Sequence, residues 1–180
     1  MLEEKDFITA LLNPKTQNVA FQKLLRDYQK PLYNHIRNIV LNHDDADDVL
    51  QNTFIKIFQH LKNFKGESKL FSWMYRIATN ESITFINQKA KRNGITSEAF
   101  QSKIVDNLKA DTYFDSSEIQ VKLQKAIVRL PEKQQLVFKM KYFEEIKYED
   151  MSEILGTSVG ALKASYHHAV KKIEEYVKGN

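Results

Sequence analysis

The sequence predicts an all-α protein made of two small helical domains joined by a flexible linker. Apolar residues recur at intervals of three and four along most of the 180 residues, which is the period of an amphipathic helix. Glycine and proline occur 5 and 3 times, too rarely for the many tight turns of a β-rich protein. The helical period lapses between residues 93 and 117, so we expect domains at 1–92 and 118–180, with 93–117 as the linker.

The N-terminal domain should hold its helices at residues 7–12, 19–40, 44–64 and 71–89. Pro31 lies inside the second of these periods, so a kink or a break is expected there. The third helix begins with four carboxylates within five residues, and Asp44 or Asp45 is the expected N-cap. A short break around Gly66 separates it from the fourth helix.

In the C-terminal domain, the apolar period predicts helices at 118–130, from Pro131 onward, at 147–155 and at 158–177. The last two have the pattern of a helix-turn-helix. Gly156 can take the left-handed conformation that ends a helix, and Ser158 can cap the next one. The expected buried stripe of the final helix is Val159, Leu162, Tyr166, Ala169 and Ile173.

The opposite face of that final helix carries small, histidine and basic side chains: Ala161, Lys163, Ser165, His167, His168, Lys171 and Lys172. It has no acid before Glu174, whereas the preceding helix is acidic. Such a face suits the major groove of DNA, where these side chains reach phosphates and base edges. An ordinary solvated face is the alternative. The turn, the stripe and the missing acids together favour DNA binding.

Aromatic and basic residues alternate around the start of the fourth helix: Phe71, Trp73, Met74 and Tyr75 lie among Lys65, Lys69 and Arg76. Some of the apolar side chains must be core, and taken alone that is the simpler interpretation. Rings interleaved with cations are also what holds unstacked bases beside a phosphate backbone. Glu67 and Ser68 in the break offer polar groups to an extruded base.

Composition narrows the class of protein. With no cysteine there are no disulfides or thiolate metal sites, and a reducing cytoplasm fits. Apolar runs are far shorter than the ~20 residues of a membrane-spanning helix, so no membrane insertion is expected. The acidic start MLEEKDFITALL does not suggest a signal peptide. The net charge of +4 mildly favours a polyanionic partner.

The sequence shows no recognisable pattern of metal-binding, phosphate-binding or catalytic residues. His35, His43 and His60 are too far apart for a recognisable metal spacing, and the adjacent His167 and His168 point apart on a helix. The carboxylates at 44–48 lack the spacing of an EF-hand. There is no phosphate-binding glycine loop and no nucleophile with a base. The sequence therefore predicts no catalytic residue, no metal, no cofactor and no small-molecule substrate.

Three stretches together resemble one family: DADDVLQNTFIKIF, FKGESKLFSWMYRIATN and LPEKQQLVFKMKYFEEIKYEDMSEILGTSVGALKASYHHAVKKI. They are similar to a sigma-70 family RNA polymerase sigma factor, of the short extracytoplasmic-function (ECF) type with regions 2 and 4 alone. The resemblance runs from about residue 21 to residue 176. It implies a bacterial transcription initiation factor that binds core RNA polymerase, reads the −10 and −35 promoter elements and helps to melt the duplex.

The resemblance implies a role for each matched segment. The polymerase-binding residues would be Asp44, Asp47, Asp48, Gln51, Asn52 and Phe54, docking on the β′ coiled coil. The family usually has a carboxylate at Asn52, so that contact should be weaker or altered. The −10 residues would be Phe64, Lys65, Gly66, Glu67, Ser68, Lys69, Phe71, Trp73, Arg76, Asn80, Lys89, Lys91 and Arg92.

The −35 residues would be Ser158, Val159, Ala161, Lys163, Ala164, Ser165, His167, His168, Lys171 and Lys172. The preceding helices would bind the β flap. Ala161, Ala164, Ser165 and His168 replace the family's usual Thr, Ser and two Arg, so an uncommon −35 sequence is expected. An anti-sigma factor is the further implied partner. Two other classes stay open: a stand-alone helix-turn-helix regulator, which leaves residues 44–92 without a role, and a nucleic-acid enzyme.

Overall fold

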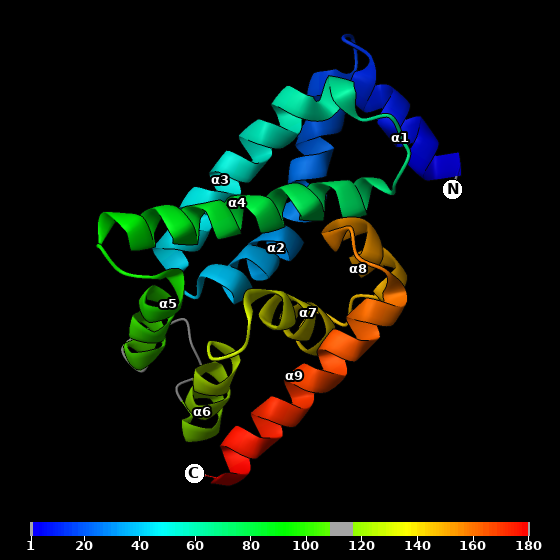
Figure 1. Cartoon of the computed structure of the whole chain (residues 1–180). Coiled ribbons are helices and arrows are strands. Elements are labelled where there is room, and N and C mark those ends of the chain that lie inside the picture. Colours follow the sequence, from blue (N-terminus) through cyan, green and yellow to red (C-terminus); the bar gives the residue numbers. More distant parts are fainter. Residues whose placement is uncertain (1, 109–116, 180) are drawn as a thin grey trace.

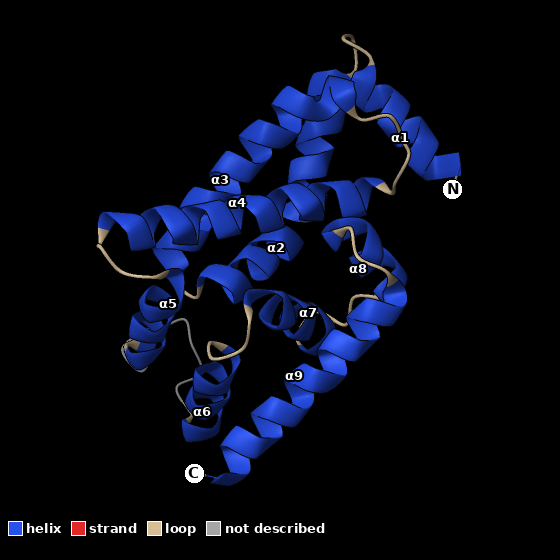
Figure 2. Cartoon of the chain, in the orientation of Figure 1, coloured by secondary structure: helices blue, strands red, loops and turns tan. Residues whose placement is uncertain are grey.

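The computed structural model describes residues 2–108 and 117–179, and within those ranges it is helical without any strand (Figure 2). The elements are α1 (Leu2–Leu12), α2 (Gln17–Val40), α3 (His43–His60), the 3-10 turn η1 (Leu61–Asn63), α4 (Leu70–Arg92), α5 (Ser97–Asp106), α6 (Glu118–Ile127), α7 (Glu132–Tyr142), α8 (Tyr148–Leu155) and α9 (Val159–Gly179). The predicted all-α class is confirmed.

The long helices α2, α3 and α4 form one bundle, with α4 lying across the other two (Figure 1). Their apolar faces meet in a core that includes Leu24, Leu32, Ile36, Val49, Ile57, Met74 and Ala78. Full burial of one large aliphatic side chain contributes about 1.5–3 kcal/mol. This shared core fixes α3 and α4 relative to each other, so the side chains on their outward faces extend from rigid helices.

Pro31 does not break the second helix, because α2 runs without interruption from Gln17 to Val40. A proline removes one backbone donor, so the carbonyl of Asp27 loses its usual partner. Both Pro31 and Asp27 lie on the exposed side of α2, where water can take that place.

The predicted N-cap of the third helix is wrong. Asn42 caps α3, and its Oδ1 accepts a hydrogen bond from the Asp45 N–H at 3.0 Å. Leu41 ends α2 in the left-handed conformation with φ of 64°, so the chain turns at once and the first side-chain acceptor is Asn42. Asp45 is 8% exposed and forms an ion pair with Lys89 of α4 at 2.5 Å. Asp45 therefore ties α3 to α4.

The segment predicted as a linker contains a helix that the sequence pattern did not indicate. Thr96 caps α5 by accepting from the Ala99 N–H at 3.1 Å. Val105 and the following Leu108 are buried with Leu41 and Val128. Residues 105 and 108, in the middle of the predicted linker, are thus packed against the C-terminal ends of α2 and α6. Its residues 109–116 lie outside the described residues.

In the C-terminal region, α7 is enclosed by α9 on one side and by the N-terminal bundle on the other (Figure 1). Gly156 ends α8 with φ of 62°, and Ser158 Oγ accepts from the Ala161 N–H at 3.3 Å. Leu162, Ala169 and Ile173 of the predicted stripe are buried. The helix-turn-helix of α8 and α9 is confirmed.

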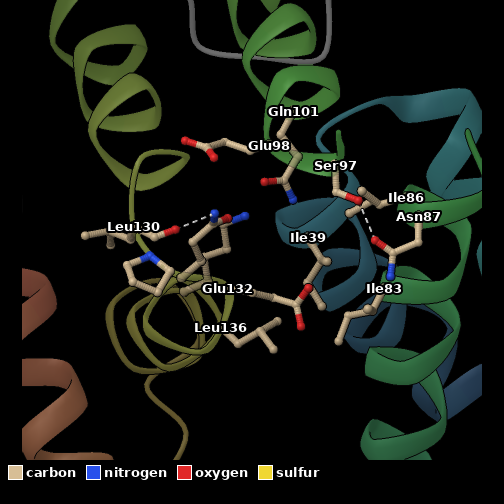
Figure 3. Close-up of a pocket in the computed structure, with 13 residues that line it drawn as sticks. Ile39, Ile83, Ile86, Asn87, Ser97, Glu98, Gln101, Leu130, Glu132 and Leu136 are labelled. Carbon is tan, nitrogen blue, oxygen red and sulfur yellow. Dashed lines mark hydrogen bonds between the residues drawn. The ribbon is translucent and has the colours of Figure 1, made fainter. Parts of the chain in front are cut away.

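The two predicted domains pack against each other. Helix α8 lies beneath the start of α4, and α7 lies against α2 (Figure 1). Leu136, Met140, Met151 and Ile154 from the C-terminal region are buried in the same core as the α2–α4 bundle. A small pocket of about 150 Å³ remains where α2, α4, α5 and the turn before α7 meet (Figure 3).

Lys139 of α7 lines that pocket and is 2% exposed. Burial penalises its ammonium group and lowers its pKa from 10.5 to about 8. Below about pH 8 the Lys139 ammonium group is charged in the folded protein, so the folded state bears the full free-energy cost of burying that charge. Between about pH 8 and 10.5 the folded protein gives up this proton before the unfolded chain does, so the free energy of unfolding should rise with pH.

Replacing this side chain tests the buried charge. Lys139→Met should raise the free energy of unfolding by about 1–3 kcal/mol at neutral pH, because an uncharged side chain of similar length fills the same space. It should also flatten the rise between pH 8 and 10.5. Chemical denaturation at several pH values measures both effects, with the exposed Lys133→Met on the same helix as control. An unchanged pH slope in Lys139→Met would contradict this account of Lys139.

Candidate functional site

The acidic start of α3 forms an exposed face. Asp44, Asp47, Asp48, Gln51 and Asn52 all point to solvent, and Phe54 is half-buried beside them. Because α3 is capped by Asn42 and its inner face is fixed by core contacts, the exposed carboxylates are presented from a rigid helix. Their negative charge at a helix N-terminus is stabilised by the helix dipole, so they are available to a basic partner.

Two apolar side chains that the sequence pattern did not single out continue this face. Ile55 is 54% exposed and Phe58 is 44% exposed, and the Phe58 ring lies 5.0 Å from that of Phe21. Position 55 follows Asp48 and Gln51 at helical spacing. In the sequence, helical spacing from Asp48 and Gln51 was the one signal that could have placed these two residues on the docking face. A large apolar residue in a helix is more often part of the core, so only their exposure in the structure assigns Ile55 and Phe58 to this face.

The break before α4 forms the wall of a pocket of about 430 Å³. Phe64 is buried and its ring lies 5.1 Å from that of the half-buried Trp73. Lys65, Glu67 and Ser68 line the opening together with Arg76 and Glu153. Gly66 has φ of 71°, which suits glycine because a side chain is strained there. The pocket offers an aromatic wall and polar groups of both charges, as an unstacked base requires.

The aromatic residues at the start of α4 divide between core and surface. Tyr75 is buried, and burial raises its pKa above the usual 10.0. Phe71 is half-buried, with its ring 4.1 Å from that of Tyr75. Trp73 is therefore the aromatic side chain of this group that lines the pocket.

The outward face of α4 carries most of the remaining predicted −10 residues. Trp73, Arg76, Asn80 and Lys91 share one helical face, and Arg76, Asn80 and Lys91 are exposed. Thr84 lies between them and is exposed as well, although the sequence pattern did not indicate it. Lys91 and Arg92 lie at the far end of α4, roughly 30 Å from the pocket by helix rise. The structure therefore places these residues along a strip instead of in one cluster.

Lys89 is placed differently from its neighbours. Its Nζ pairs with Asp45 and lies 5.1 Å from the centre of the Phe85 ring. Lys91 and Arg92 are exposed, whereas Lys89 is half-buried against α3. Lys89 therefore has a structural partner before any nucleic acid binds.

The predicted −35 face of α9 is presented to solvent. Ala161, Lys163, Ala164, His167, His168, Lys171 and Lys172 are exposed. Val159 and Ser165 are half-buried, and the Ser158 hydroxyl oxygen accepts the Ala161 N–H. Lys163, His167 and Lys171 recur every four residues, so they form one ridge. This ridge could enter a major groove while Leu162 and Ala169 hold the helix from behind.

No other chemistry is apparent among the described residues. Within 2–108 and 117–179, no three histidine, aspartate or glutamate side chains are grouped to hold a metal ion. The same part of the chain has no helix long and apolar enough to cross a membrane.

Comparisons with known proteins point to one family. The family descriptions "Sigma-70 region 2" and "Sigma-70, region 4" match residues 24–92 and 120–173. The RNA polymerase sigma factor SigZ of Bacillus subtilis is 30% identical over 158 residues, covering 88% of this chain and 87% of that protein. The ECF RNA polymerase sigma factor SigW of the same organism is 28% identical over 167 residues, covering 88% of this chain and 89% of that protein.

A solved structure has the same fold. The sigma factor RpoE from Bartonella quintana, in complex with the anti-sigma factor NepR, aligns with a TM-score of 0.64 and 20% identity, over 88% of this chain and 96% of that chain. Segments matching regions 2 and 4 occur in order along one chain, with the relatives covered almost end to end. The chain therefore belongs to the sigma-70 family of RNA polymerase sigma factors, of the ECF type, and is a transcription initiation factor that directs the polymerase to promoters.

Proposed function

We infer that the three exposed surfaces divide the work of initiation. The face of α3 from Asp44 to Phe54 docks core RNA polymerase on its β′ coiled coil. The pocket beside Trp73 and the outer strip of α4 read the −10 element as single-stranded DNA. The ridge of α9 reads the −35 element in the major groove, while α6 and α7 approach the β flap.

The observation that carries this proposal is the pocket beside Trp73. Its volume of about 430 Å³, its aromatic wall and the adjoining Lys65 and Arg76 fit one extruded base next to a backbone phosphate. A double-stranded site would not need such a pocket. The α9 ridge presents no exposed Phe, Tyr or Trp side chain and fits duplex DNA instead.

A stand-alone helix-turn-helix regulator accounts for α8 and α9 alone. It leaves the acidic face of α3 and the pocket at α4 without a role, so the sigma-factor function is favoured. We further propose that the protein does no chemistry of its own, works in the cytoplasm and is held inactive by an anti-sigma factor. The RpoE–NepR complex gives a precedent for such a partner in a protein of this fold.

Reconstitution with core polymerase tests the proposal. The purified chain should co-elute with core RNA polymerase in one-to-one ratio and should support run-off transcription from a subset of genomic promoter fragments. Core polymerase alone, on the same fragments, is the control. Specific binding of duplex promoter fragments by the free chain, with no association with core polymerase, would instead support the stand-alone regulator.

A further inference from the structure

The pocket between α5 and α7 lies apart from the three surfaces proposed for initiation. It opens where α2, α4, α5 and the turn before α7 meet, and its volume is about 150 Å³ (Figure 3). None of the described residues that line it belongs to the α3 docking face, the −10 residues or the α9 ridge. An apolar cavity of this size accommodates one benzene molecule, so the pocket admits a ligand of about six to eight non-hydrogen atoms.

Branched aliphatic side chains build the apolar wall of the pocket. Ile39 of α2 and Ile83 and Ile86 of α4 line one side, and Leu130 and Leu136 line the other (Figure 3). All of them except the half-buried Ile83 are buried in the interior of the protein. Their packing fixes the shape of the wall, so the pocket is formed before any ligand enters. Such a wall favours an aliphatic ligand, because burying its apolar surface is stabilising.

A buried cation lies within this wall. Lys139 of α7 lines the pocket and is 2% exposed. Among residues 2–108 and 117–179, its ammonium group forms neither a hydrogen bond nor an ion pair. The charge of Glu144 acts on Lys139, but that carboxylate is hydrogen-bonded to His35. A buried charge without a partner costs stability, and the pocket beside it leaves room for an anion that would pair with it.

The first turns of two helices also line the pocket. Ser97, Glu98 and Gln101 come from the start of the 10-residue α5, and Pro131 and Glu132 from the start of the 11-residue α7. Each helix start has unsatisfied N–H groups and a partial positive charge, which favour a negative group. Together with the Lys139 ammonium group, they make the interior of the pocket suitable for an anion.

The acids at the opening limit the charge of that anion. Glu98 and Glu132 line the pocket and are exposed, so solvent and salt weaken their repulsion of a ligand. A single negative charge can therefore pair with Lys139. A dianion such as phosphate would meet the same cation beside both acids, which makes its binding less favourable. The charges around the pocket thus select a monoanion.

We propose that this pocket binds a small aliphatic monocarboxylate. The ligand's carboxylate pairs with the Lys139 ammonium group, and its hydrocarbon chain packs against Ile39, Ile83 and Ile86. A charge that is buried at a cost to stability fits a binding role, because sequences depart from stable packing mainly at functional sites. The inference goes beyond the proposed function and does not rest on it. Since the helical bundle, α5 and α7 all contribute to the wall, the bound ligand joins these parts and stabilises the folded chain.

Titration of the full-length chain with isovalerate tests the site. This branched carboxylate has the size and charge that the pocket admits. It should shift the carbon-13 methyl signals of Ile39, Ile83 and Ile86 in a saturable manner, with a dissociation constant of about 1 mM. At about 10 mM it should raise the melting temperature by about 3–5 °C, with sodium chloride at equal ionic strength as the control. Absence of saturable shifts at these three residues would overturn the proposal and leave the pocket to water.

Uncharged and positively charged analogues test the role of the carboxylate. Isovaleramide keeps the shape of isovalerate without its charge, so it should bind at least ~10-fold more weakly. Isoamylamine carries the opposite charge and should not bind beside Lys139. Inorganic phosphate should not displace isovalerate. Equal affinity for isovalerate and isovaleramide would show that apolar packing alone fills the pocket, and displacement by phosphate would show a general anion site; either result would overturn the proposal.

Two variants locate the ligand on the protein. Lys139→Met removes the cation while keeping the length of the side chain, and it should lower the affinity for isovalerate at least ~10-fold. Lys133→Met, at an exposed position of the same helix, is the matched control and should bind as the unaltered chain does. Ile83→Phe adds bulk to the wall, leaves the ammonium group in place and should also block binding. Circular dichroism melting checks that each variant is folded. Unaltered affinity in either Lys139→Met or Ile83→Phe would contradict the proposed site.

Discussion

Changing Asp48 to Lys together with Gln51 to Ala is expected to abolish binding to core RNA polymerase. The two residues lie three apart on the exposed face of α3, and neither belongs to the core. The partner surface implied by the family is basic, so the lysine places like charges together and the alanine removes a polar contact. Like-charge juxtaposition at an interface costs several kcal/mol, which corresponds to a loss of affinity of at least ~100-fold. Fluorescence anisotropy with labelled protein and core polymerase measures it.

The matched control for this pair is Asp6→Lys with Gln22→Ala. It makes the same chemical change at exposed positions of α1 and α2, two helices that contribute none of the predicted docking residues. The control should bind core polymerase as the unaltered protein does, and both variants should retain the helical circular dichroism spectrum. Holoenzyme formation at unaltered affinity by the Asp48→Lys, Gln51→Ala variant would show that polymerase docks elsewhere.

Trp73→Ala and Lys163→Ala are expected to fail at different steps of promoter binding. Trp73 forms the aromatic wall of the pocket, and losing a ring that stacks on an unpaired base costs about 1–3 kcal/mol. That loss should appear when the duplex opens. Lys163 is exposed on the α9 ridge, so its removal should weaken the closed complex and reduce the salt dependence of binding. Permanganate footprinting measures opening, and filter binding across salt concentrations measures the closed complex.

If Trp73 only stabilises the core, the Trp73→Ala variant should show a different combination of opening defect and loss of thermal stability. The Trp73 ring lies against the buried Phe64, so some loss of thermal stability accompanies its removal. Phe64→Leu is the useful comparison, because it removes the buried ring that contacts Trp73 while the Trp73 ring itself stays in the pocket lining. An opening defect of the same size in Phe64→Leu and Trp73→Ala, with matching losses of melting temperature, would assign Trp73 to the core alone.

Local patterns predicted most of the fold. Gly156 and Ser158 identified the turn between α8 and α9, and the apolar period identified the inner faces of α2, α3 and α9. These features depend on neighbouring residues, so they are visible in one stretch of sequence. The cap of α3 was missed because Asn42 precedes four carboxylates that are equally good caps. Which of them caps α3 depends on where α2 ends.

Features that depend on distant residues could not be predicted. Helix α5 has a short and weak apolar period, and it is fixed by contacts that bring Val105 and Leu108 to Leu41 and Val128. The packing of the two regions likewise joins residues far apart, such as His35 and Glu144. In the sequence, Lys69 and Arg76 indicated DNA binding, and the helix that is α8 was noted only as acidic. In the structure Lys69 Nζ pairs with Asp150 Oδ1 of that helix. Their pairing became visible when the two regions were placed together.

The sequence predicted many of the residues on the candidate surfaces, but it did not predict how far each surface extends. The resemblance supplied Asp48, Gln51, Trp73 and Lys163, whose positions in the family pattern are matched in this chain. Ile55, Phe58 and Thr84 emerge from the structure, because only their exposure on the same faces distinguishes them from core or neutral positions.

The division of labour between the two DNA-reading surfaces is tested most directly with a promoter that is already melted across the −10 region. Open-complex formation by the Trp73→Ala and Lys163→Ala holoenzymes is compared on this template and on the intact duplex. Because the template supplies the opened strands, it should rescue much of the Trp73→Ala defect and little of the Lys163→Ala defect. Equal rescue of the two variants would contradict the assignment of strand opening to the pocket at α4 and of duplex reading to α9.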